Sequence, residues 1–172
     1  MSAKQYSPSS NPDSPSYPGE HDLDATDLRI LRLLQTRSDL TNREVAATMG
    51  LTPSPVYERI KRLEKTGVIQ RYVALVNREK LGLRLMAFCN VSIKEHARPF
   101  ILQFEEEIKT LPEVVECFHT AGGFDYLLKV IVPDMDSYQR FIVEKLAALE
   151  NIGRVQSSFV MDEIKHGTEL PI

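Results

Sequence analysis

The most constraining feature of this sequence is the short distance between two helical patterns, because only two residues separate them. The first pattern lies in "TNREVAATMG", where Thr41 and Glu44 have the spacing of a capping box and Gly50 is the residue expected to end the helix. The second pattern begins at Thr52, with Pro53 at its first helical position. So short a connection forces a sharp bend between the two helices, which is typical of a helix-turn-helix.

A third helical pattern precedes this pair, in "LDATDLRILRLLQTR". Leu28, Leu31 and Leu34 recur there at three-residue steps, and Asp24 stands where an N-cap is expected. The sequence therefore predicts three short helices that share one core. The apolar faces expected for the two later helices are Val45, Ala46 and Met49, followed by Val56, Ile60 and Leu63.

The charge of the chain is unevenly distributed. The formal net charge is −3, which taken alone argues against a nucleic-acid binder. Residues 24–80, however, carry 11 Lys and Arg against 7 Asp and Glu, a net charge of +4, whereas residues 81–172 carry 9 against 14, a net charge of −5. The predicted helices therefore belong to a basic region that is joined to an acidic one.

A helix-turn-helix lays its last helix in the DNA major groove, with the N-terminal end of that helix toward the base edges. Ser54 and Tyr57 come early enough in the helix to meet bases, whereas Lys61, Arg62 and Lys65 are better placed for phosphates. The full set of candidate DNA contacts is Thr52, Ser54, Pro55, Tyr57, Glu58, Arg59, Lys61, Arg62 and Lys65. The alternative is a plain three-helix domain whose Lys and Arg residues form only a solvated face.

The second half of the chain repeats the pattern strand, helix, strand. We expect strands at residues 84–93, 113–121, 125–133 and 154–165, and helices at residues 98–111 and 135–149. The expected core sides of the helices are Phe100, Phe104, Ile108 and Leu111 in the first, and Tyr138, Phe141, Ile142, the Lys145 stem and Leu149 in the second. The order βαββαβ predicts an α+β fold, a ferredoxin-like sandwich whose antiparallel sheet carries both helices on one face. The other face of the sheet then needs a cover.

Composition suggests the domain boundaries. Residues 1–22 are rich in Ser and Pro and are expected to form a disordered tail. The further boundaries we expect are residues 23–70 for the helix-turn-helix domain, 71–83 for a hinge strand or linker, 84–167 for the sandwich and 168–172 for a short C-terminal tail. The sequence predicts neither a membrane-spanning helix nor a secretory signal, so we expect no membrane partner and a cytoplasmic protein.

No group of residues has the spacing of a catalytic or metal site. Cys89 and Cys117 stand alone, without the spacing of metal ligands, and are expected to be two buried thiols. His96, His119 and His166 lie far apart, and no nucleophile–base spacing or phosphate-binding loop is present. We therefore expect no enzymatic activity, no metal and no cofactor.

Taken together, these segments resemble the Lrp/AsnC family, the feast/famine transcription regulators of bacteria and archaea. "GLTPSPVYERIKRLEKTGVI" carries most of the resemblance, "LDATDLRILRLLQ" and "GFDYLLKVIVPDMDSY" support it, and it extends over about residues 23–167. The resemblance implies a nucleoid-associated, sequence-specific regulator that binds double-stranded DNA through a winged helix-turn-helix. It also implies a sandwich domain that dimerises through its sheet and assembles further into octamers, which would supply the missing cover.

The resemblance further implies a site for a small molecule, usually an amino acid, between dimers and near the hairpin of the second and third strands. That hairpin is "TAGGFDY" here, in which Asp125 would face the ligand's ammonium group and glycine amides its carboxylate. The residues that the resemblance assigns to this effector site are Thr120, Ala121, Gly122, Gly123, Phe124, Asp125 and Ser157. Gly123 departs from the family pattern, because many members have an acidic residue at this position.

Two alternatives stay open. Asp125 can simply cap a hairpin turn whose positive φ angles come from Gly122 and Gly123. The whole protein, in turn, can be an effector-independent architectural DNA binder whose acidic domain only assembles oligomers.

Overall fold

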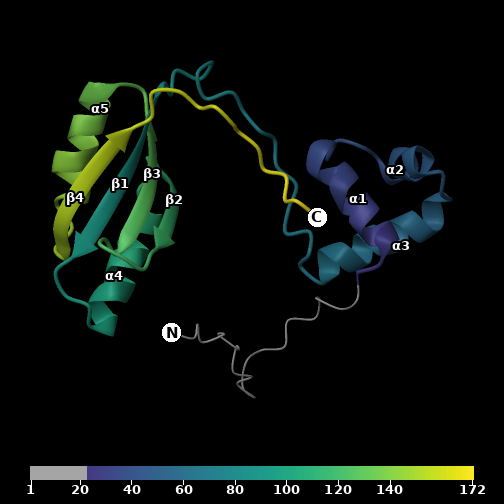
Figure 1. Cartoon of the computed structure of the whole chain (residues 1–172), viewed down its shortest axis with the longest axis horizontal. Helices are drawn as coiled ribbons and strands as arrows, with labels where there is room; N and C mark the ends of the chain where they lie inside the picture. The colour runs from purple at the N-terminus through teal and green to yellow at the C-terminus, as the bar shows by residue number, and fades with distance from the viewer. Residues whose placement is uncertain (1–22) are drawn as a thin grey trace, which may run out of the picture. The chain divides into compact units, whose positions relative to one another are not determined.

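A computed structural model of the chain describes residues 23–172, so the tail predicted for residues 1–22 lies outside the described part. The chain divides into two compact units (Figure 1). The first unit contains the described residues up to Ala74 together with Gly167–Ile172, and the second contains Leu75–His166. Each unit has a hydrophobic core of its own.

The first unit consists of three helices, α1 (Ala25–Thr36), α2 (Asn42–Met49) and α3 (Pro53–Lys65). The predicted caps of α1 and α2 are confirmed: the Asp24 carboxylate accepts from two backbone N–H groups, and Thr41 forms a capping box with Glu44. Gly50 ends α2 in the left-handed conformation, with φ of 67°. Thr52 has the extended backbone of an N-cap, but its side chain makes no capping hydrogen bond.

The core of the first unit follows the predicted faces of α2 and α3 but not that of α1. Ile30 and Leu34 are the buried apolar residues of α1, whereas Leu28 and Leu31 are only half-buried. Leu28, Leu31 and Leu34 therefore do not form one buried face, because the three-residue step drifts off a face that repeats every 3.6 residues, but Leu31 still packs against the core. The remaining core residues are Val45, Ala46, Met49, Val56, Ile60 and Leu63.

The second unit is an antiparallel four-stranded sheet with the strand order β2-β3-β1-β4. The strands are β1 (Leu85–Ile93), β2 (Val114–His119), β3 (Tyr126–Val132) and β4 (Ile152–Phe159). The helices are α4 (Arg98–Lys109) after β1 and α5 (Met135–Arg140) after β3. This order confirms the predicted βαββαβ fold, and β4 ends six residues before the expected end at residue 165.

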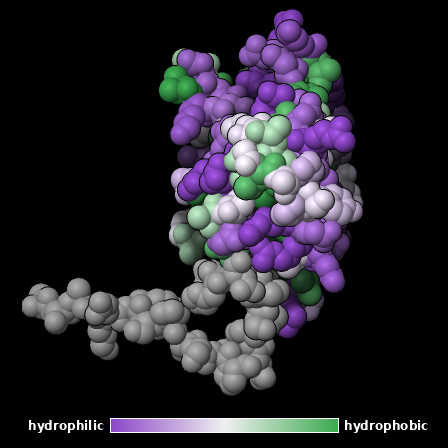
Figure 2. Space-filling view, turned by 90° about the vertical axis from the view of Figure 1, so that its right-hand side faces the viewer, coloured by the Kyte–Doolittle hydropathy of each residue, from purple (hydrophilic) through white to green (hydrophobic). Residues whose placement is uncertain are grey.

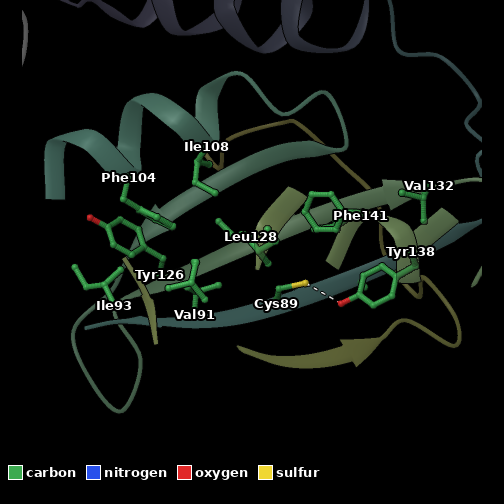
Figure 3. Packing of buried hydrophobic residues seen from close by; sticks show 14 residues of the cluster. Cys89, Val91, Ile93, Phe104, Ile108, Tyr126, Leu128, Val132, Tyr138 and Phe141 are labelled. Atoms are coloured by element: carbon green, nitrogen blue, oxygen red, sulfur yellow. Dashed lines mark hydrogen bonds between the residues drawn. The ribbon is translucent and has the colours of Figure 1, made fainter. Parts of the chain in front are cut away.

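Both helices of the second unit pack on the same face of the sheet. Tyr126 and Leu128 point from β3 toward the helices, where the Tyr126 ring lies 4.6 Å from that of Phe104 (Figure 3). Phe104 and Ile108 are buried as predicted. Phe100 is 43% exposed, so its assignment to the core was wrong; it lies in the first turn of α4, and Ile101 packs against the core instead.

The helix after β3 is not a regular α-helix throughout. From Phe141 to Leu146 it continues as a π-helix, η1, whose wider turn places both of these end residues in the core, five positions apart. An α-helix would instead have turned Lys145 toward the core, as the sequence suggested. In the structure the Lys145 ammonium is paired with the Glu113 carboxylate.

The segment between the units, residues 70–84, contains no helix or strand, and turns occupy residues 78–82. Its apolar residues Tyr72, Val73, Leu75 and Val76 are exposed. At the other end of the chain, the Gln35 side chain of α1 exchanges two hydrogen bonds with the backbone of Leu170. The C-terminal segment is thus part of the first unit.

Cys89 is buried but Cys117 is exposed, so the prediction of two buried thiols was wrong for Cys117. Cys117 lies on β2, which is an edge strand of the described sheet and pairs there with β3 alone. Among residues 23–172, no helix has the length and apolar character needed to span a bilayer. The same residues contain no group of three or more His, Cys, Asp or Glu side chains arranged to hold a metal ion.

Candidate DNA-binding and effector sites

The outer face of α3 is a continuous polar surface. Val56, Ile60 and Leu63 face the core, which turns the intervening side chains outward. The exposed candidates are Thr52, Ser54, Pro55, Tyr57, Glu58, Lys61, Arg62 and Lys65. Seen from the side of the three helices, hydrophilic residues prevail, with a hydrophobic patch near the middle of the view and others toward its edges (Figure 2). Its chemistry suits the phosphate and base edges of DNA.

Two arginines of this helix are already engaged inside the unit. Arg59 Nη1 donates to Asp27 Oδ1 at 2.8 Å and also to Asp24, and Arg62 Nη2 donates to Asp27 Oδ2. Asp27 is 0% exposed, and its Oδ2 also accepts from the backbone N–H of Asp24. This three-residue cluster, Asp27 with Arg59 and Arg62, joins the start of α1 to the middle of α3.

The Asp27 carboxyl remains ionised because its partners outweigh its burial. Burial acts to raise its pKa, but hydrogen bonds from Arg59, the Asp24 backbone and Arg62 together hold the pKa below its ordinary value. A buried carboxylate with both oxygens bonded to cations is a fixed anchor for the helix that carries the cations. The sequence analysis missed Asp27, although its position three residues after the N-cap marked it as a capping residue.

Lys61 and Lys65 remain available on the outer face. The Lys61 ammonium lies 2.9 Å from the Glu64 carboxylate and 5.9 Å from the centre of the Tyr57 ring. The Lys61–Glu64 pair raises the pKa of Lys61, so this lysine is fully charged at neutral pH. An exposed pair of this kind contributes little to stability and opens readily to another anion.

The β2–β3 hairpin brings the chain from Thr120 to Asp125 together. Its turn is closed by the Thr120 N–H, which donates to the Asp125 carbonyl at 2.8 Å, and by the Thr120 hydroxyl, which donates to the Phe124 carbonyl at 3.0 Å. The Arg154 guanidinium of β4 lies 5.5 Å from the centre of the Phe124 ring. Thr120, Ala121, Gly122 and Gly123 are exposed, so the hairpin presents its backbone to solvent.

The alternative to a ligand site was that the Asp125 side chain caps this turn. In the structure it does not. Its Oδ2 accepts from the backbone N–H of Ile93 at 2.9 Å, and its Oδ1 lies 2.9 Å from His96 Nε2. The carboxylate therefore ties the hairpin to the end of β1. Burial acts to raise its pKa, but the Ile93 N–H and His96 hold the pKa below its ordinary value, so the group is an anion at neutral pH.

The two glycines of the hairpin differ in what they require. Gly122 has φ of 147°, whereas Gly123 does not have a positive φ, so the expectation of two such angles was wrong for Gly123. A Cβ at residue 123 would meet no atom within 4 Å. The Cβ of another residue, such as the acidic one that many family members carry here, would therefore fit without moving the hairpin backbone.

This difference leads to a paired prediction. We expect Gly122→Ala to lower the free energy of unfolding of the sandwich unit by about 1 kcal/mol, because an L-residue is strained at that φ. Gly123→Ala should change it by less than about 0.5 kcal/mol. Urea unfolding followed by circular dichroism measures both, and equal losses would show that the hairpin differs from this description.

The structure does not bring Ser157 to the hairpin. Its hydroxyl accepts from the Tyr138 hydroxyl on the helix-covered side of the sheet, where Cys89 Sγ lies 3.1 Å from the same tyrosine oxygen (Figure 3). The strand register separates Ser157 from Asp125 by about three residues along the sheet and two strand spacings across it, about 14 Å. Within one chain the two belong to different environments.

The helix-free face of the sheet presents apolar side chains. Phe118 and Leu127 lie opposite each other on this face, and the Lys129 ammonium is 2.9 Å from the Glu116 carboxylate beside them. Phe118 is 49% exposed, and Phe88, Leu127 and Ile131 are half-buried. No helix within residues 23–172 covers these side chains.

The chain is similar to characterised proteins over most of its length. Residues 23–70 match the family described as "Winged helix-turn-helix DNA-binding", and residues 86–170 match the "Lrp/AsnC ligand binding domain". The leucine-responsive regulatory protein of Escherichia coli strain K12 is 38% identical over 160 residues, which are 93% of this chain and 97% of that protein.

Solved structures agree in fold as well as in sequence. A Neisseria meningitidis transcriptional regulator in complex with L-Met has 40% identity and a TM-score of 0.83, over 87% of this chain and 96% of that one. The feast or famine regulatory protein of M. tuberculosis, complexed with L-methionine, has 26% identity and a TM-score of 0.78, over 86% of this chain and 97% of that one.

Proposed function

The chain belongs to the Lrp/AsnC family of transcriptional regulators, and from this premise we propose that α3 reads an operator while the β2–β3 hairpin binds an amino-acid effector. The protein is a DNA-binding regulator with a ligand-binding domain. The observation that carries the assignment to α3 is its division into a buried apolar face and an outer polar face. DNA as the target also favours a cytoplasmic, nucleoid-associated location.

We divide the DNA contacts by what each side chain is free to do. Ser54 and Tyr57 stand in the first turns of α3 and are assigned to base edges. Lys61 and Lys65 are assigned to phosphates. The remaining candidates on the outer face are Thr52, Pro55 and Glu58, which flank the base-reading turns. Arg59 and Arg62 are positioning residues, because Asp27 holds their guanidinium groups against α1.

The proposed effector is a small α-amino acid. Its ammonium group would face the Asp125 carboxylate, and the exposed amides of the hairpin, at Ala121, Gly122 and Gly123, would face its carboxylate. The complexes of the Neisseria and M. tuberculosis relatives with L-methionine support this ligand class. Ser157 would contribute only if the site were completed by a second chain.

We further propose that two chains pair through the helix-free face of the sheet. Such a pairing would remove the apolar side chains of this face from water, and their burial would be its main contribution to the free energy of dimerisation. These side chains are Phe88, Phe118, Leu127 and Ile131. A two-fold dimer also presents two copies of α3 to a two-fold operator. Assembly of dimers into an octamer is the further step that we propose for the intact regulator.

One experiment tests DNA binding and effector response together. The full chain is used to select sites from a random duplex library, and the selected duplex is titrated with and without L-methionine and L-leucine. We expect a defined site and a change in its affinity with at least one of the two amino acids. An effector-independent architectural protein would bind the duplex equally in both conditions, and a protein that selects no site would contradict the assignment of α3.

Asp125→Asn tests the site itself. The substitution keeps the shape and the bond from Ile93 but removes the charge that faces the ligand ammonium, so we expect amino-acid affinity to fall at least tenfold. Isothermal titration measures the loss of affinity for L-methionine and for its analogue that lacks the amino group. The comparison shows how much of the loss depends on the ligand's ammonium group. Equal losses for both compounds would show that Asp125 acts through folding rather than through charge.

A further inference from the structure

The proposed effector site contains an internal cation. His96 lies in the loop between β1 and α4, and its Nε2 is 2.9 Å from Asp125 Oδ1, the oxygen that the Ile93 N–H does not use. Each oxygen of the carboxylate thus has a partner within the chain before any ligand arrives. An incoming ammonium group must share or replace one of these two partners.

We propose that His96 occupies the place of the effector's ammonium group and competes with the effector for Asp125. This inference rests on the proposed amino-acid site at the hairpin. It makes His96 a regulatory residue of that site, which releases the carboxylate when an amino acid binds.

The geometry shows which of the two partners can leave. The Ile93 N–H belongs to the backbone of β1 and cannot move without breaking the strand. The His96 side chain is 62% exposed, and within the described residues its bond to Asp125 is the only hydrogen bond that its ring makes. Rotation of the imidazole into water therefore frees Oδ1 at small cost.

The competition depends on the charge of the imidazole. Histidine is the side chain whose ordinary titration falls between about pH 5 and pH 8, and a protonated imidazole binds a carboxylate more strongly than a neutral one. Asp125 stays ionised over this range because its pKa lies below the ordinary value. The amino group of a free amino acid stays protonated over the same range, so the ligand's charge does not change.

Other titratable or charged groups lie near the hairpin, and their effect has to be separated from that of His96. His119, at the end of β2, stacks on Tyr126 with 4.7 Å between ring centres and adds positive charge near Asp125 when protonated. The Arg154 guanidinium of β4 lies over the Phe124 ring of the same hairpin. Tyr126 stays neutral, because burial and the nearby Glu105 raise its pKa. His119 is therefore the control for His96.

The test is the affinity of the full chain for L-methionine and L-leucine at about pH 8 and about pH 5.5, measured by isothermal titration. For the wild type we expect about fivefold weaker binding at the lower pH, the factor that an exposed ion pair supplies. His96→Gln should bind with nearly equal affinity at both pH values. This affinity should be at least as high as that of the wild type at about pH 8. His96→Lys, a permanent cation, should bind weakly at both. His119→Gln should keep the wild-type ratio.

The possible results distinguish a failure of the His96 competition from a failure of the proposed effector site. If the wild type and His96→Gln show the same ratio between the two pH values, the competition is overturned while the amino-acid site stands. A ratio that disappears in His119→Gln instead assigns the effect to His119 and also overturns it. If neither amino acid binds any variant at either pH, the effector site itself is wrong, and the competition falls with it.

Discussion

Replacing Asp27 with Asn should lower the free energy of unfolding of the three-helix unit by about 3 kcal/mol. The substitution leaves Arg59 and Arg62 without the buried anion that holds them, and breaking one side of a buried ion pair costs about 3–5 kcal/mol. We take the lower figure because both guanidinium groups are partly exposed and can be solvated. Hydrogen exchange of peptides from α1 and α3 should speed up about 100-fold, while peptides from the sandwich unit stay protected.

Asp39→Asn is the matched control. Asp39 pairs with Arg37 near the same helix, but both side chains are more than half exposed, so exchange of α1 and α3 should stay near the wild-type rate. If the Asp27 and Asp39 variants exchange alike, or if the sandwich peptides lose as much protection as α1, the anchoring role of Asp27 is contradicted.

The pH dependence of this effect has a definite sign. The pKa of Asp27 is lower in the folded chain than in the unfolded chain, so its contribution is complete above the unfolded value of about 3.9. It is lost as the pH falls through the folded value. The difference in stability between the wild type and Asp27→Asn should therefore be constant from about pH 7 to pH 5 and shrink below about pH 4.

Replacing Lys61 and Lys65 together with Ala should weaken binding to a random-sequence duplex by about fiftyfold at about 0.1 M salt for each α3 that contacts the DNA. Each phosphate contact contributes about 0.9 to the slope of log affinity against log salt, so two lost contacts lower the slope by nearly 2 for each α3 bound. The loss should be the same for a selected site and for random DNA, because phosphates carry no sequence information. Fluorescence anisotropy over a salt series measures both quantities.

Lys109→Ala is the control for this pair. Lys109 lies on α4 and forms an exposed pair with Glu106 at the same three-residue spacing as Lys61 and Glu64. Its removal subtracts one positive charge without touching α3, so the slope should not change. An unchanged salt slope in the Lys61/Lys65 variant would contradict the phosphate assignment. A loss of affinity for the selected site alone would indicate that these lysines contact bases instead.

Much of the fold could be predicted from local sequence. The caps at Asp24 and Thr41, the end of α2 at Gly50 and the strand β3 each depend on residues close in the chain, and the structure confirms them. The fold class followed from the order of these elements. The DNA-facing residues of α3 could be narrowed to one face because the opposite face had to be apolar.

The contacts that decide the roles of individual residues could not be predicted, because they join distant parts of the chain. Arg62 and Lys61 are neighbouring basic residues on the exposed side of α3, and their local sequence does not distinguish their roles. The distinction comes from the bond between Arg62 and Asp27, which lies 35 residues away in the chain. His96 meets Asp125 from 29 residues away, in a loop whose sequence gives no sign of it. Phe100 was misplaced because an apolar residue at a suitable spacing is buried only where its helix packs against another element.

The π-helix from Phe141 to Leu146 has a consequence for how the length of this region can vary. A π-turn holds one residue more than the α-turn it replaces, so η1 is equivalent to the insertion of one residue into an α-helix. The two core residues on either side of this insertion, Phe141 and Leu146, both remain buried. Deleting one residue from the middle of the turn, such as the exposed Val143, should restore an α-helix with Phe141 and the former Leu146 four positions apart and still buried. Relatives that differ from this chain by one residue here would therefore differ within the turn and not in the loops on either side.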